Sequence, residues 1–281
     1  MLVLWCAVVA VLLLVALCGY LPKHSSSWAL HPDPRVYSKF KLVKRTQVSH
    51  NTLRLEFALP SPSHRLGLPL GRHVSIRPVG QPDLARSYTP ISSDDRLGSF
   101  ELLIKVYPSG KLTPILEKLA LGDFVEVAGP RGLLTYQGNG AVVIKGRTET
   151  RTTVKELAMV AGGSGITPMF QVAQAVLSNP NDSTRVSLIF ANVTEQDILL
   201  RQELETLQEQ HGRLRIFFTL DKPPQDWRFG SGFVSAEMMQ QHLPAADQDV
   251  MLLVCGPPPM VDSVKRLASS LGFASDRVYA F

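Results

Sequence analysis

Three short motifs follow one another along the chain, and their residue types are suited to holding two phosphate-bearing ligands. They are Arg86-Ser87-Tyr88-Thr89-Pro90, Gly162-Gly163-Ser164-Gly165-Ile166-Thr167-Pro168-Met169 and Cys255-Gly256-Pro257-Pro258-Pro259-Met260. An arginine can bind a phosphate through two hydrogen bonds, and an aromatic side chain can cover a flat ring. Glycines after an apolar strand let a ligand approach the backbone and leave free N–H groups for a phosphate. The order predicts a flat aromatic cofactor with a phosphate tail at the first motif and a second nucleotide at the others.

Each motif has an ordinary structural interpretation when it is taken alone. The first can be a strand with an incidental arginine, and the second can be the tight strand-to-helix turn of any α/β protein. Cys255 in the third can be a buried structural cysteine. The presence of all three motifs in one chain favours ligand binding.

The first half of the chain has the pattern of short antiparallel strands. Apolar and polar residues alternate over 40–59, with a break at Ser49-His50-Asn51, and again over 74–78, 87–91, 99–106 and 123–128. Gly and Pro turns separate these segments, which predicts a closed antiparallel β-barrel domain over residues 23–144. The spacing of apolar residues predicts one helix within it, over 113–121.

The second half has a different pattern, and a polar, Thr- and Arg-rich stretch at 145–155 is the predicted linker. Apolar strands are predicted over 157–160, 186–190, 215–220 and 250–254. Helical patterns alternate with them near 167–178, 198–208, 236–242 and 260–271. Such alternation predicts an α/β domain with a parallel sheet over residues 156–281.

The N-terminus has the composition of a transmembrane helix. Residues 2–18 carry no charge, and Gly19, Tyr20 and Leu21 extend the apolar run to roughly the 20 residues that a bilayer-spanning helix needs. A secretory signal starts with basic residues, whereas none precedes Lys23 here. The sequence therefore predicts an uncleaved anchor over residues 1–22.

Basic residues and cysteines indicate a cytosolic location for the rest of the chain. Lys and Arg residues gather directly after the apolar run, which by the positive-inside tendency keeps the downstream part in the cytosol. Of the three cysteines, Cys6 and Cys18 lie in the predicted anchor, which leaves only Cys255 in the folded part. A reducing compartment fits this distribution.

Charge is divided unevenly between the two halves. Residues 23–155 contain 20 Lys and Arg against 10 Asp and Glu, a net charge of +10, whereas residues 156–281 contain 9 against 14, a net charge of −5. The basic residues are spread along strand-like segments without a nucleic-acid-binding module, so a nucleic-acid partner is not expected. The alternatives are an acidic protein partner and a merely solvated basic face, and we favour the first.

Together with further segments, the three motifs resemble the NADH-cytochrome b5 reductase family within the ferredoxin-reductase-like flavoproteins. The resemblance extends from about Val36 to Phe281. The further segments are Ile104-Lys105-Val106-Tyr107, Gly110-Lys111-Leu112-Thr113, Phe190-Ala191-Asn192, Asp197-Ile198-Leu199-Leu200 and Thr219-Leu220-Asp221. This resemblance implies that the barrel holds most of the FAD and that the α/β domain holds NADH.

The resemblance also assigns roles to residues around the flavin. Arg86 is expected at the FAD diphosphate, Tyr88 along the cofactor and the Thr89 hydroxyl near the reactive ring nitrogen. The segment 110–113 corresponds to Gly-Lys-Met-Ser in the family and is expected to meet the diphosphate at the start of a helix. Only Pro108 and Ser109 precede it here, where many members have a longer loop.

The resemblance places Cys255 beside the nicotinamide ring as an orienting group. It places Ser164, where the family usually has Thr, beside the flavin. Lys105 is either a solvated lysine or an NADH-binding residue. Asp221 ends a strand, where a carboxylate can bind ribose hydroxyls and repel a 2′-phosphate, so NADH is the expected donor.

The residues predicted to act in catalysis are Thr89 and Cys255. The residues predicted to bind the cofactors are Arg86, Tyr88, Thr89, Ser92, Lys105, Tyr107, Gly110, Lys111, Leu112, Thr113, Gly162, Gly163, Ser164, Thr167, Pro168, Asp221, Cys255, Gly256, Pro257, Pro258 and Met260. His50 and His73 are expected to be ordinary hydrogen-bonded histidines. No cluster has the spacing of metal ligands, so no metal is predicted.

The resemblance implies a membrane-anchored enzyme that passes hydride from NADH to FAD and then single electrons to a haem protein such as cytochrome b5. The expected location is the endoplasmic reticulum or the mitochondrial outer membrane, where the electrons would support lipid desaturation or sterol-type reactions. Two alternatives remain: a related NAD(P)H flavin reductase that serves another acceptor, and a membrane-tethered binding module without turnover.

Overall fold

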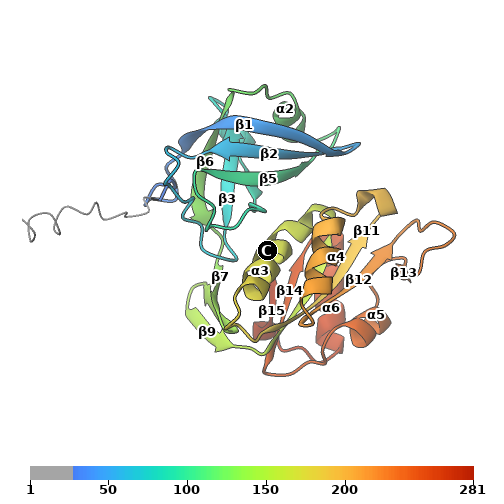
Figure 1. The fold of residues 1–281 in the computed structure, drawn as a ribbon. Coiled ribbons are helices and arrows are strands. Elements are labelled where there is room, and N and C mark those ends of the chain that lie inside the picture. Colours follow the sequence, from blue (N-terminus) through green and yellow to red (C-terminus); the bar gives the residue numbers. More distant parts are fainter. Residues whose placement is uncertain (1–27) are drawn as a thin grey trace, which may run out of the picture.

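A computed structural model describes residues 28–281 as two domains with a small sheet beside them (Figure 1). The predicted anchor at 1–22 lies outside the described residues. Within 28–281, none of the helices has both the length and the apolar character needed to cross a bilayer.

The first domain is built on a six-stranded antiparallel sheet of order β4-β3-β6-β1-β2-β5. Alternate side chains of its strands share one buried core, which includes Phe40, Phe57 and Phe100. Among residues 28–281 no ladder pairs edge strands β4 and β5, but Ile91, just after β4, donates its backbone N–H to Glu101 O of β5 at 3.0 Å. The antiparallel sheet of the prediction is therefore present, and this hydrogen bond spans the gap between its two edges. The strands are β1 (Ser38–Ser49), β2 (Thr52–Ala58), β3 (His73–Pro78), β4 (Arg86–Tyr88), β5 (Ser99–Lys105) and β6 (Phe124–Arg131).

The helix of this domain is shorter than the predicted 113–121. Helix α2 covers only Thr113–Glu117. Its Leu116 is buried in the sheet core, whereas Leu121 is 66% exposed. A helix of little more than one turn adds little dipole, so this segment meets a ligand mainly through its own side chains and backbone.

The predicted linker at 145–155 belongs largely to a three-stranded antiparallel sheet. Strands β7 (Leu134–Gly138), β8 (Ala141–Lys145) and β9 (Glu149–Thr153) pair in chain order. The sheet is fixed to the second domain by Tyr136, whose buried hydroxyl donates to Asp182 at 2.6 Å.

The second domain contains the predicted parallel sheet, with strand order β13-β12-β11-β10-β14-β15. Alternate residues of β10 face opposite ways: Leu157 and Met159 pack with helices α3 and α4, while Ala158 and Val160 pack with α5 and α6. The elements are β10 (Glu156–Gly162), α3 (Ile166–Ser178), β11 (Arg185–Asn192), α4 (Arg201–Gln210), β12 (Leu214–Leu220), β13 (Gly230–Ser231), α5 (Ala236–His242), β14 (Val250–Cys255), α6 (Pro258–Ser270) and β15 (Val278–Ala280).

Strand register brings two of the motifs together. Ala161 of β10 lies opposite Cys255 of β14, and Gly162 lies opposite Ala191 of β11. Asn192 in turn lies opposite Leu220, directly before Asp221. The glycine motif, the cysteine motif and Asp221 therefore share the carboxyl edge of the sheet, where folds of this kind bind ligands.

Candidate functional site

Two adjoining cavities lie where this carboxyl edge faces the first domain. Their volumes are about 710 and 420 Å³, which is the range of small-molecule sites. Both are lined by Lys105 and Tyr107 from the first domain and by Gly162, Gly163 and Pro257 from the second. Ligands in the two cavities would therefore meet at this shared boundary.

The larger cavity collects most of the predicted site residues from both domains. Arg86, Tyr88 and Thr89 come from β4 and its end, and Cys255, Gly256 and Pro257 come from the end of β14. The other residues that were predicted to bind a cofactor and that line this cavity are Lys105, Tyr107, Gly110, Lys111, Leu112, Thr113, Gly162, Gly163, Ser164, Thr167 and Pro168.

Arg86 is available to an anion. Its side chain is exposed, and its Nη1 donates to the backbone oxygen of Ala85 at 2.7 Å. Within the described part of the chain, no carboxylate forms an ion pair with it. Burial raises the pKa of neighbouring Tyr88 to about 12, so its phenol stays neutral and presents an aromatic face.

Gly110 and Thr113 close a tight turn at the cavity wall. Gly110 N donates to Tyr107 O at 2.8 Å, and Tyr107 N donates to Thr113 Oγ1 at 3.1 Å. Thr113 thus supports the turn through its hydroxyl, and it also lines the cavity. Lys111 between them is exposed.

Glycines keep the backbone of the larger cavity open to a ligand. A Cβ at Gly162 would lie 2.5 Å from Met260 Sδ and 3.1 Å from Pro257 Cδ. A Cβ at Gly165 would overlap the backbone carbonyl of Cys255. The glycine and cysteine loops therefore contact each other directly, and any side chain at these positions would fill the space between them.

The smaller cavity contains Asp221 and Met260, together with residues from the ends of β11 and β12. Asp221 N donates to Asn192 O at 3.0 Å, which fixes the aspartate beside the cavity. Desolvation raises the pKa of Asp221, although Lys222 opposes this.

Lys105 is not a solvated lysine. Its side chain is only 12% exposed, and Nζ lies 2.7 Å from Oδ1 of Asp197 in the other domain. Of the two interpretations, the structure therefore excludes the solvated one.

Cys255 and His73 both line the larger cavity as uncharged groups. Burial raises the pKa of the Cys255 thiol to about 11, so the thiol is protonated at neutral pH and is not an activated nucleophile. Burial, with help from Arg131 and Arg72, lowers the pKa of His73. Sequence reasoning placed His73 among ordinary histidines, whereas the structure brings it to the cavity wall.

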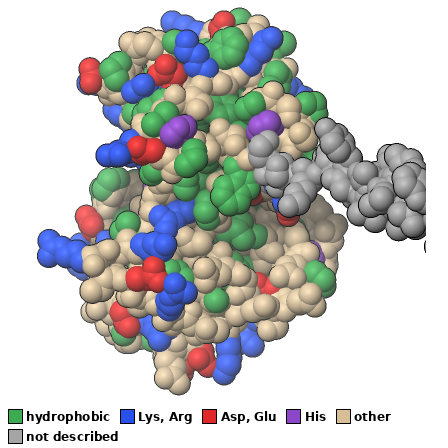
Figure 2. Space-filling view, turned by 90° about the vertical axis from the view of Figure 1, so that its left-hand side faces the viewer, with side chains coloured by type: hydrophobic (Ala, Val, Ile, Leu, Met, Phe, Trp, Pro, Cys, Tyr) green, Lys and Arg blue, Asp and Glu red, His purple; other side chains and the backbone are tan. Residues whose placement is uncertain are grey.

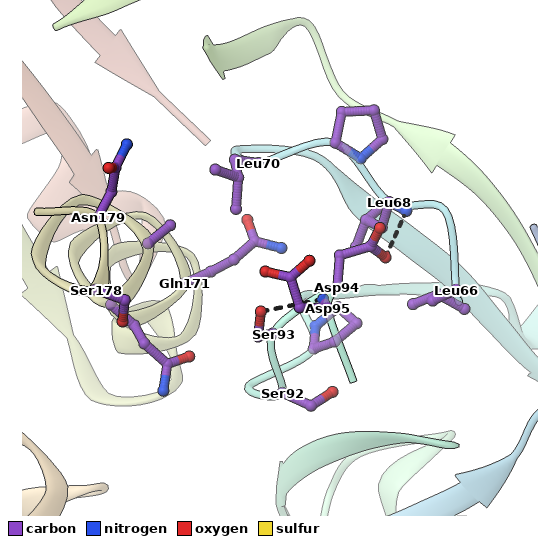
Figure 3. Close-up of a pocket in the computed structure, with 14 residues that line it drawn as sticks. Leu66, Leu68, Leu70, Ser92, Ser93, Asp94, Asp95, Gln171, Ser178 and Asn179 are labelled. Atoms are coloured by element: carbon purple, nitrogen blue, oxygen red, sulfur yellow. Dashed lines mark hydrogen bonds between the residues drawn. The ribbon is translucent and has the colours of Figure 1, made fainter. Parts of the chain in front are cut away.

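Two predicted residues lie outside both cavities. Pro258 is the first residue of α6, and its neighbours Pro257 and Pro259 line the cavities instead. The Ser92 hydroxyl accepts a hydrogen bond from Glu101 N at 3.0 Å and lines a separate cavity of about 500 Å³, between the first domain and α3 (Figure 3). Ser92 therefore lies on the wall of a different cavity from Arg86.

Comparison with known proteins agrees with this geometry. A family model described as "Oxidoreductase FAD-binding domain" matches residues 39–136, and one described as "Oxidoreductase NAD-binding domain" matches residues 159–266. The chain is 46% identical over 266 residues to a Bos taurus protein named NADH-cytochrome b5 reductase 1, covering 89% of this chain and 87% of that protein.

Two further relatives extend the match over more of the chain. The protein of the same name from Meyerozyma guilliermondii is 43% identical over 270 residues, which is 95% of this chain and 90% of that one. The cytochrome b5 reductase domain of Ulva prolifera nitrate reductase superposes with a TM-score of 0.85 at 36% identity, over 91% of this chain and all of that domain. The chain belongs to the NADH-cytochrome b5 reductase family.

As a member of this family the protein is an FAD- and NAD-binding oxidoreductase, and its cavities fit the two cofactors. The larger combines an arginine that forms no ion pair within residues 28–281, an aromatic face and open glycine backbone, which suits the diphosphate and ring of FAD. The smaller adjoins it and has a carboxylate for ribose hydroxyls, which suits NADH. Among residues 28–281 no group of His, Cys, Asp and Glu has the arrangement of a metal site.

Phe281 and Asn192 are among the lining residues of this reductase site that sequence reasoning did not predict to bind a cofactor. Phe281 lines the larger cavity, where its backbone N donates to Val254 O at 3.0 Å and its ring packs edge-on against Tyr279. Asn192 lines the smaller cavity and is 7% exposed, but neither atom of its amide has a partner within the described residues. An unsatisfied buried amide at a ligand cavity indicates that the ligand supplies the missing hydrogen bonds.

We expect Asn192→Leu to change stability and nucleotide affinity in opposite directions. Leucine has a similar size and removes two unsatisfied polar atoms, so the free energy of unfolding without nucleotide should rise by about 1 kcal/mol. Loss of the ligand's hydrogen bonds should weaken NAD⁺ binding by about tenfold. Chemical denaturation and calorimetric titration measure the two effects, and unchanged NAD⁺ affinity would remove Asn192 from the site.

Proposed function

We propose that the protein is a membrane-anchored NADH-cytochrome b5 reductase that delivers single electrons to cytochrome b5 or a similarly acidic haem protein. The observation that carries the proposal is the shared boundary of the two cavities at Lys105, Tyr107, Gly162, Gly163 and Pro257. Bound at this site, FAD would supply the chemistry of accepting a hydride from NADH and passing on single electrons. The chain contributes binding, orientation and electrostatics around that exchange.

The residues at the boundary have distinct roles in this proposal. Arg86 binds the flavin diphosphate and Tyr88 covers the cofactor. Thr89 presents its hydroxyl to the flavin, while Cys255, uncharged because its pKa is raised to about 11, orients the nicotinamide by contact. Asp221 binds the ribose of NADH. Positioning of two reactants in adjoining cavities is the main rate contribution available to such a site.

The membrane part of the proposal rests on the N-terminal sequence. The apolar run at 2–21 and the basic residues after it favour a single-pass anchor with the catalytic domains in the cytosol. We propose the endoplasmic reticulum or the mitochondrial outer membrane as the location, and lipid desaturation or sterol-type reactions as the consumers of the electrons. Sedimentation of the full chain with membranes after a high-salt or alkaline wash supports the anchor, and release into the supernatant contradicts it.

The basic first domain predicts that electron delivery depends on ionic strength. Residues 23–155 have a net charge of +10, and Figure 2 shows several Lys and Arg side chains of this domain on the face in view. Raising the salt from 0.05 to 0.5 M shortens the Debye length from about 14 to about 4 Å, so the second-order rate with cytochrome b5 should fall by roughly tenfold or more. Reduction of the flavin at saturating NADH needs no protein partner and should change less than twofold. A cytochrome b5 rate that is independent of salt would contradict an acidic partner.

A further inference from the structure

One ion pair joins the two domains at the boundary of the two cavities. Lys105 is the last residue of β5 in the first domain, and Asp197 ends a 3₁₀ turn at Glu195–Asp197 that follows β11 in the second. Lys105 Nζ lies 2.7 Å from Asp197 Oδ1, and the two side chains are 12% and 14% exposed. A pair with this burial is protected from solvent screening, unlike most surface pairs.

Asp197 is itself held in place from the other side. Its Oδ2 accepts hydrogen bonds from Thr194 N at 3.1 Å and from Thr194 Oγ1 at 2.7 Å, which completes the cap of the 3₁₀ turn. Burial opposes ionisation of this carboxyl, but hydrogen bonds from Lys105 and Thr194 outweigh burial and lower the pKa of Asp197. The carboxylate is therefore charged, oriented and directed at Lys105.

Only Lys105 of this pair reaches the cavities. Lys105 lines both of them, whereas Asp197 lines neither. An ammonium has three N–H donors, so the bond to Asp197 leaves two for a ligand at the boundary. A second ion pair between the domains, Arg54–Glu203 at 2.7 Å, is 33% and 41% exposed and lies outside both cavities. It provides a matched comparison.

We propose that Asp197 is a positioning residue for NADH. It acts through Lys105: the ion pair fixes the ammonium group where the cavities meet, and it fixes the spacing of the two domains there. Because the lysine is ordered before the ligand arrives, binding does not have to restrict its flexible side chain. Because the pair crosses the domain boundary, it also sets the approach of the nicotinamide to the flavin, a distance on which transfer depends steeply. The inference rests on the proposed function, since it places NADH in the smaller cavity.

A double-mutant cycle on the FAD-loaded protein tests the proposal. The variants are Asp197→Asn, Lys105→Met, both together, and Glu203→Gln as the matched control. Flavin content and the melting temperature are measured first, then the Kd for NAD⁺ by calorimetry and the limiting rate of anaerobic flavin reduction by NADH. We expect Asp197→Asn to raise the Kd and to lower the limiting rate by about tenfold each, while Glu203→Gln changes either by less than twofold.

The decisive comparison is the effect of Asp197→Asn in the Lys105→Met background. If Asp197 acts through Lys105, its substitution there changes the Kd and the rate by less than twofold. An equal tenfold effect in both backgrounds, or none in either, overturns the proposal. If Asp197→Asn does not fold, Thr194→Val takes its place, because it removes only the hydroxyl that orients the carboxylate. Thr194→Val must then raise the Kd and lower the rate by less than tenfold, and both effects must disappear in the Lys105→Met background. Failure of the unaltered protein to bind NAD⁺ or to be reduced by NADH would instead contradict the proposed function.

Discussion

Asp221→Thr is expected to remove most of the preference for NADH over NADPH. Asp221 follows β12 at the carboxyl edge of the sheet and lines the smaller cavity. If the 2′-phosphate of NADPH lies about 5 Å from this carboxylate, an effective dielectric constant near 20 gives a repulsion of roughly 3 kcal/mol, or about a hundredfold in affinity. Threonine retains a hydrogen-bonding group for the ribose and removes the charge.

The measurement is the ratio of kcat/KM for NADH to that for NADPH in the two proteins. We expect the ratio to fall by about a hundredfold, mostly through a gain with NADPH. Asp276→Thr is the matched control, because Asp276 is an exposed aspartate of the same domain that lines neither cavity, and its ratio should stay within twofold. An unchanged ratio in Asp221→Thr would show that another group selects the donor.

Gly165→Ala is expected to disrupt both the fold of the second domain and the site. The added Cβ would lie 2.5 Å from the carbonyl carbon of Cys255 and 2.8 Å from the amide nitrogen of Gly256, in addition to overlapping the Cys255 oxygen. These are backbone atoms, so no side-chain rotation relieves the contact. Overpacking of this kind costs about 3 kcal/mol, and a displaced Cys255 loop should slow flavin reduction by NADH by on the order of a hundredfold.

Denaturant unfolding and stopped-flow reduction measure these two effects. Gly212→Ala is the control, since a Cβ at Gly212 meets no atom within 4 Å and its φ is not in the left-handed region. That variant should match the unaltered protein in both measurements. Normal stability and rate in Gly165→Ala would mean that the two loops are not in contact.

Strands and helices with a clear pattern of apolar residues are predictable from the sequence. Strands β10, β11 and β14 are buried along most of their length, so their apolar runs are continuous, and α5 was predicted at Ala236–His242 as observed. Strand β9 has no such signal, because its residues are almost all exposed and pair only with β8. For this reason a polar strand was predicted to be a linker.

Much of the site could be predicted because its motifs are contiguous and lie at strand ends. What could not be predicted depends on contacts between distant segments. Lys105 and Asp197 are 92 residues apart and meet only because the domains pack together. Asn192 is informative only once its amide is seen to lack partners beside a cavity. Ser92 follows the first motif closely in sequence, yet it lines another cavity, which only the structure shows.

The central claim is that electrons pass from NADH through the adjoining cavities to cytochrome b5. The most direct test mixes the FAD-loaded full chain with NADH without oxygen and then adds oxidised cytochrome b5, while flavin and haem absorbance are followed together. We predict that NADH bleaches the flavin absorbance and that haem reduction follows as this absorbance returns. A flavin that NADH does not bleach, or a bleached flavin that leaves cytochrome b5 oxidised, would contradict the account.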